Sequence, residues 1–166
     1  MTRPVQVERE ASMIEDLPNA LTTRARRWLT SKLREVERAI TRGATAPDTL
    51  IVPMLDVVDD AGGTHIMLLH DLPAEASARG ERVGLAVAAV GGVGFVWYYD
   101  ARIRHQRGGP VVSEALVAIV QTRDGFRAGL AGRYTRGRTW TFERVGALVE
   151  PTTVIQVPTW PAPTRH

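Results

Sequence analysis

The sequence predicts a single α+β domain, in which an N-terminal amphipathic helix precedes a mixed, mostly antiparallel sheet. Three observations support this fold class. Apolar residues recur every three or four positions over residues 16–43, short β-forming runs joined by turn-forming residues follow residue 50, and one helical stretch interrupts those runs. The expected order is helix, hairpin, helix, strand and three-strand meander. With 166 residues, 44% of them hydrophobic, the chain has the size and composition of one globular domain.

The first helix is expected over residues 16–43, after a flexible N-terminus at 1–15. Asp16 suits the N-cap, Pro18 is tolerated in the first turn and Gly43 ends the segment. Its apolar stripe consists of Leu21, Ala25, Trp28, Leu29, Leu33, Val36 and Ile40. Part of this stripe also fits a short coiled-coil seam. Two packings therefore stay open: docking on the chain's own sheet, which we favour, and pairing of helix 21–40 with a second copy.

A β-hairpin is expected next, with strands at 50–58 and 64–70 around the turn-rich segment 59–63. Both strands are apolar on both faces, which predicts a central place in a covered sheet. Pro53 indicates a bulge or an edge at that point. A symmetric hairpin sets His65 opposite Val57, and a slip of one residue sets it opposite Asp56.

A second helix is expected from about Asp71 to about Val90, where Gly80 and Gly84 let a neighbouring segment approach closely. A strand follows at Val93–Tyr99, and residues 101–110 form a basic loop. The meander is expected at 114–122, 126–135 and 139–145. The domain therefore spans residues 16–150, and the proline-rich tail at 151–166 is expected to be extended.

Several chemistries are excluded or disfavoured by the residues that the chain lacks. Without cysteine there is no disulfide, no thiolate nucleophile and no cysteine-ligated zinc. The one lysine, Lys32, lies in a helical context and not after a glycine-rich phosphate loop. Neither a His-Glu-x-x-His nor a Gly-x-Ser-x-Gly motif is present. We therefore expect no metal and no cofactor. With no secretory signal and no apolar run long enough to span a bilayer, we expect a cytoplasmic protein.

The charge of the chain is segregated along the sequence. Residues 1–42 carry nine basic and six acidic side chains, residues 43–100 carry two and eight, and residues 101–166 carry ten and four. All basic residues but Lys32 are arginines, which suggests a high-GC bacterium or its phage as the source. Guanidinium groups also bind carboxylates and phosphates through two parallel hydrogen bonds.

The basic C-terminal part supplies the candidate binding residues. These are Arg102, Arg104 and Arg107 in the loop, with Arg127, Arg133, Arg136 and Arg138 on the meander. If loop and meander adjoin, they form one surface suited to an acidic protein or, without sequence specificity, a nucleic-acid backbone. The favoured function is therefore that of a small non-catalytic cytoplasmic binding or assembly protein. Complementarity between the acidic middle and the basic end also allows a homodimer.

The alternative is an enzyme, a hydrolase or transferase with its site at strand ends. The candidate catalytic residues are His70, Asp71 and Asp100. They converge if the two strands that carry them are parallel neighbours, because open sheets place their sites at strand ends. The arginine loop would then clamp an anionic substrate.

Overall fold

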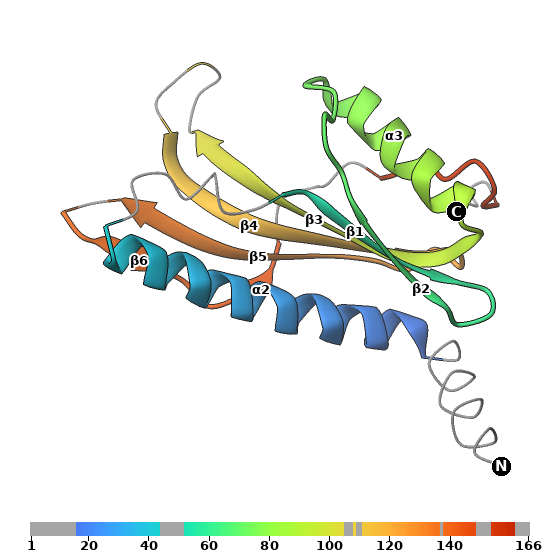
Figure 1. The fold of residues 1–166 in the computed structure, drawn as a ribbon, viewed down its shortest axis with the longest axis horizontal. Helices are drawn as coiled ribbons and strands as arrows, with labels where there is room; N and C mark the ends of the chain where they lie inside the picture. Colours follow the sequence, from blue (N-terminus) through green and yellow to red (C-terminus); the bar gives the residue numbers. More distant parts are fainter. Residues whose placement is uncertain are drawn as a thin grey trace, which may run out of the picture.

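The computed structural model describes residues 16–43, 52–104, 108, 111–136, 138–148 and 154–161. In this part of the chain the elements follow in the order α2 (Leu17–Thr41), β1 (Met54–Asp59), β2 (Thr64–Leu68), α3 (Ala76–Ala89), β3 (Gly92–Arg104), β4 (Val111–Thr122), β5 (Arg127–Arg136), β6 (Trp140–Phe142) and β7 (Gly146–Ala147). Helix α2 lies on one face of the sheet and helix α3 on the other (Figure 1). The α+β fold and the order of its elements are as the sequence predicts.

The strands form one sheet in the order β2-β1-β3-β4-β5-β6, and β7 also pairs with β5. Each pairing between these strands is antiparallel, so the sheet is simpler than the mixed sheet that we expected. The hairpin register is the symmetric one, with Val57 opposite His65 and Asp56 opposite Ile66.

Helix α2 packs on its own sheet through the predicted apolar stripe. Leu21, Ala25 and Leu29 are fully buried, and the stripe continues to Leu33 and Val36. The helix starts over β3, where a Cβ atom on Gly94 would lie 2.7 Å from the Leu17 side chain, and it crosses to β5, where a Cβ atom on Gly132 would lie 3.1 Å from the Leu33 side chain. Because the stripe is buried in the chain's own core, it is not available as a coiled-coil seam to a second copy.

The opposite face of the sheet is covered by α3 and by the C-terminal segment 154–161. Ile155 and Val157 of that segment are buried with residues of α3 and β3. The Gln121 side-chain amide holds both backbone polar groups of Ile155, at 2.9 and 3.2 Å. A Cβ atom on Gly84 would lie 1.9 Å from the carbonyl oxygen of Gln156, so the close approach expected at this glycine is confirmed. The described part of the tail is a docked layer of the fold.

Both strands of the hairpin were predicted to lie centrally in the sheet, which is correct for β1 and wrong for β2. β1 lies between β2 and β3 and is buried over most of its length. β2 is an edge strand in which exposed and half-buried residues alternate. The physical reason is the course of α2, which runs from β3 to β5 and leaves its face of β2 uncovered.

Two further boundaries differ from the expected ones. β3 continues to Arg104 and β4 starts at Val111, so Arg102 and Arg104 lie on a strand and not in a loop. Helix α3 starts at Ala76, because the Glu75 carboxylate caps it by accepting hydrogen bonds from the backbone N–H groups of Ser77 and Ala78. These hydrogen bonds hold the pKa of Glu75 below its usual value.

Candidate functional site

The carboxylate partner of His65 is Asp59, which the sequence analysis did not identify. The His65 Nε2 atom lies 2.7 Å from one carboxylate oxygen of Asp59, and the backbone N–H groups of Ala61 and Gly63 donate to the other. The hydrogen bond with His65 lowers the pKa of Asp59 most, followed by the bond from Gly63. Asp59 therefore holds the turn of the hairpin. An aspartate at the start of a turn is the signal that could have found this role.

Asp56, the alternative partner of His65, instead binds Arg24 of helix α2. The Arg24 guanidinium nitrogen Nη1 lies 2.8 and 2.9 Å from the two carboxylate oxygens, and Asp56 is only 4% exposed. Nearby, the ring of Trp28 rests on that of Tyr98 with their centroids 4.2 Å apart. Burial raises the pKa of Tyr98, and the charge of Asp56 raises it further, so this phenol keeps its proton. This cluster fixes α2 to β1 and β3.

The candidate catalytic residues do not lie on neighbouring strands. β2 and β3 run in the same direction, but β1 lies between them. His70 lies two residues beyond the end of β2, whereas Asp100 lies within β3. The prediction that these residues converge required β2 and β3 to be neighbours, and they are not. Asp71, which follows His70, has a left-handed backbone conformation with φ +56°.

The predicted arginine surface is divided by the sheet. Tyr98 faces α2, and so does Arg102 by strand alternation, where its Nε atom lies 3.8 Å from a carboxylate oxygen of Glu114. On β5, Arg127 and Arg133 alternate with Leu130, which faces α2, so they belong to the opposite face. Arg104 and Arg136 lie at strand ends and Arg138 in the turn before β6, while Arg107 lies outside the described residues.

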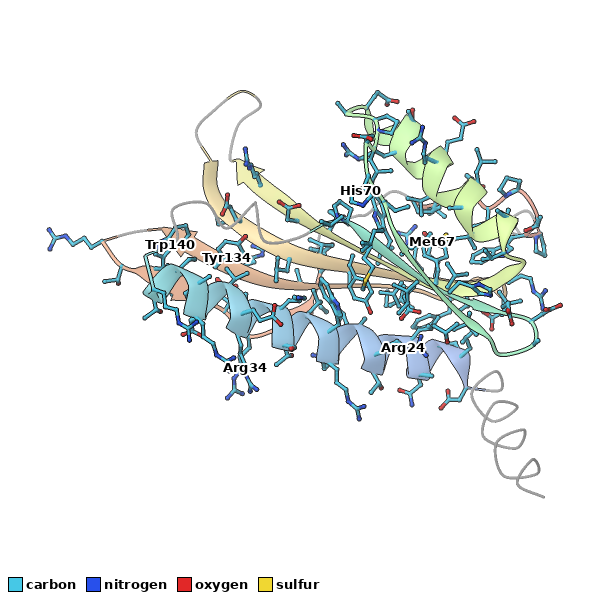
Figure 2. All side chains as sticks on the ribbon, viewed as in Figure 1. Arg24, Arg34, Met67, His70, Tyr134 and Trp140 are labelled. Carbon is cyan, nitrogen blue, oxygen red and sulfur yellow. The ribbon has the colours of Figure 1, made fainter. Side chains whose placement is uncertain are left out.

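A different line of arginines lies on the solvent side of α2. Arg27, Arg34 and Arg38 are exposed and follow one another at spacings of seven and four residues, opposite the buried stripe. At 1.5 Å per residue they form a line about 16 Å long. Figure 2 shows Arg34 pointing away from the sheet. Within the described residues no ion pair involves these three side chains, whereas Lys32 pairs with Glu35 at 2.7 Å.

We call Arg27, Arg34 and Arg38 the arginine line. It borders a shallow groove of about 500 Å³, lined by Thr23, Arg26, Arg27, Thr30, Ser31, Arg34, Glu35 and Arg38. Four guanidinium groups and three hydroxyl groups line it, together with the carboxylate of Glu35. The groove therefore offers mainly hydrogen-bond donors to an anion. The helical spacing of these arginines was visible in the sequence. That they form no ion pair with the described residues depends on the folded chain and was not visible there.

A scan against protein-family models and searches of the curated proteins and of the solved structures found no match to this chain. Within the described part, no helix is long and apolar enough to cross a membrane. No group of three or more histidine, aspartate or glutamate side chains in the same part is placed to hold a metal ion.

Proposed function

We propose that this protein is a non-catalytic cytoplasmic binding or assembly protein that holds an anionic partner on the solvent side of helix α2. The observation that carries the proposal is the arginine line: three exposed guanidinium groups in a row, without an ion pair in the described part of the chain. The ligand groups are phosphates of a nucleic-acid backbone or carboxylates of an acidic protein, because both match the guanidinium fork.

The rigidity of α2 supports this role. The helix has 25 residues, and its buried stripe and the ion pair of Arg24 with Asp56 fix it to the sheet. The backbone of α2 is therefore already ordered before a partner binds, which removes one of the main costs of association.

The charge of α2 supports the same role. The helix carries six basic and two acidic side chains, a net charge of +4. Lys32 pairs with Glu35, and Arg24 pairs with Asp56 of β1. The remaining charges of the helix are Arg26, Glu37 and the three residues of the arginine line, a net charge of +3. Such a row attracts polyanions in a salt-dependent manner.

Binding of a labelled single-stranded oligonucleotide and of labelled polyglutamate, measured by fluorescence anisotropy, tests the proposal. Wild-type affinity should fall steeply between about 50 and 200 mM salt. The variant R27Q/R34Q/R38Q should bind at least about tenfold more weakly, and the slope of log affinity against log salt for the oligonucleotide should be smaller by about 2 because three contacts are lost.

The matched control is R82Q/R123Q/R127Q, which removes the same charge from exposed arginines in α3, in the β4–β5 turn and on β5. We expect it to bind both probes nearly as wild type does. Equal losses in the two triple variants would mean that only net charge matters, and the proposal would be wrong.

A further inference from the structure

The C-terminal segment at residues 154–161 lies on the face of the sheet opposite α2, beside helix α3 (Figure 1). Its buried side chains alternate with exposed ones. Ile155 and Val157 are 3% and 6% exposed, whereas the residues on either side of each are exposed. The two buried side chains pack with residues of β1, β3 and α3. This alternation is typical of an extended peptide that inserts every second side chain into its binding site.

The fold contacts the backbone of this segment as well as its side chains. The buried Gln121 amide accepts a hydrogen bond from the Ile155 N–H group at 2.9 Å and donates one to the carbonyl oxygen of the same residue at 3.2 Å. Gly84 of α3 admits the backbone of Gln156, because a Cβ atom there would lie 1.9 Å from its carbonyl oxygen. A buried side-chain amide thus pairs with both backbone groups of one residue, as a neighbouring strand does in a sheet.

Trp160 holds the other end of the segment. Its indole N–H group donates a hydrogen bond to the Gly92 carbonyl oxygen at 2.8 Å, and its ring centroid lies 5.7 Å from that of Phe95. Tryptophan combines a large apolar surface with one hydrogen-bond donor, which is typical of residues that dominate binding interfaces. The bound pattern is therefore an apolar residue, a second one two positions later and a tryptophan three positions after that. We call Gly84, Gly92, Phe95 and Gln121 the tail site.

Few hydrogen bonds join the segment to the tail site. Residues 154–161 belong to no helix or strand. Within the described part of the chain, three hydrogen bonds connect them to the rest of the fold, two with Gln121 and one from Trp160. Strand β4, in contrast, is paired along both of its edges. Segments with few backbone hydrogen bonds open at a lower free energy than core strands. The segment can therefore leave its site while the sheet stays intact.

We propose that the tail site is a peptide-binding site through which two copies of the chain exchange their C-terminal segments. A second copy carries the same segment, which makes the same contacts in trans as the chain's own segment makes in cis. Five residues, 149–153, tether the chain's own segment to Leu148 and keep it at an effective concentration in the millimolar range. The chain's own segment therefore occupies the site in dilute solution, and segments exchange as the protein concentration approaches that range.

A labelled peptide of residues 152–163 tests the site on the full chain by fluorescence anisotropy. Wild type should bind it weakly, because the chain's own segment competes. In I155T/W160A that segment has lost two of its buried contacts, so this variant should bind the peptide at least about tenfold more tightly than wild type does. Adding Q121M should abolish the gain, because a thioether does not replace the two hydrogen bonds of the amide.

The matched control is V154T/T159A, which changes two exposed residues of the same segment and should bind the peptide as weakly as wild type does. A peptide that itself carries I155T and W160A should bind to none of these proteins. Equal affinity of wild type and I155T/W160A for the unchanged peptide would overturn the peptide-binding site.

Two measurements examine whether the segment separates from the core. Circular dichroism should show that I155T/W160A keeps the fold, and loss of the native spectrum would mean that the segment is an inseparable part of the core. In wild type, the backbone amide of Ile155 should exchange its hydrogen at least about tenfold faster than the amides of β4. Equal protection of the segment and β4 would contradict separate opening.

Two complementary variants test exchange between copies. Q121M has an intact segment and a defective site, whereas I155T/W160A has an intact site and a defective segment. Light scattering should find each variant monomeric alone and a heterodimer in their equimolar mixture. A mixture that stays monomeric would overturn the exchange. The inference does not depend on the proposed function, because α2 lies on the other face of the sheet and R27Q/R34Q/R38Q should bind the peptide as wild type does.

Discussion

The Asp59 carboxylate stabilises the hairpin turn, and this stabilisation depends on pH. Its pKa is lowered in the folded state by the bond with His65 and by the backbone N–H groups, whereas an unfolded aspartate titrates near 3.8. A lowered folded-state pKa means that Asp59 contributes stability above about 3.8 and loses that contribution as the pH falls through its folded value.

We therefore expect D59N to unfold at a lower urea concentration than wild type at pH 7. The difference between the two midpoints should shrink below the unfolded pKa of 3.8 and vanish in strong acid. Urea unfolding at a series of pH values measures it. A midpoint difference that stays constant from neutral to acid pH would contradict the role given to this carboxylate.

The ion pair of Arg24 with Asp56 makes a second prediction for single residues. Asp56 is 4% exposed, so removal of its cation leaves a buried charge without its partner. R24M should destabilise the protein by about 2–3 kcal/mol, at or below the lower end of the range for buried pairs, because Arg24 itself is partly exposed.

In a D56N background the same substitution should cost much less, because no buried charge remains. The double-mutant cycle, measured by urea unfolding, reports the coupling of the two side chains. Additive effects of the two substitutions would show that the pair does not join α2 to β1 energetically.

Helix α3 and the C-terminal segment depend on each other at one glycine. A Cβ atom on Gly84 would meet backbone, 1.9 Å from the Gln156 carbonyl oxygen, whereas one on Gly80 would meet only the end of the Ile155 side chain at 3.3 Å. G84A should destabilise the protein by about 1–3 kcal/mol despite the better helix propensity of alanine. G80A is the matched control and should change stability by less than about 1 kcal/mol. Equal thermal shifts in the two variants would contradict the docked position of the segment.

Among the elements, α2 and the strands of the meander were predictable, because their apolar residues recur at helical or alternating spacing. The edge position of β2 was not, since residues apolar on both faces are typical of a central strand and only the course of α2 decides the outcome. The length of β3 was missed for a similar reason. Its pairing of Arg102 with Glu114 is a long-range contact that no local pattern encodes.

Over the whole molecule, folding redistributes the charge that is segregated in the sequence. The C-terminal arginines, predicted to form one surface, fall on both faces of the sheet, and Arg102 lies beside Glu114. The arginine line arises from the first part of the chain, because α2 turns its apolar stripe inward and so exposes the opposite side. Sequence spacing could reveal this line, but only the packing of α2 shows that it faces solvent.

The central claim is that the solvent side of α2 is the surface that binds anions. The most direct measurement is an NMR titration of the full chain with polyglutamate at low salt, followed through backbone amide shifts. The account predicts that the largest shifts occur around Arg27, Arg34 and Arg38, with smaller ones along the rest of α2. Shifts confined to β5 and its turns, around Arg127, Arg133 and Arg138, with α2 unchanged, would contradict it.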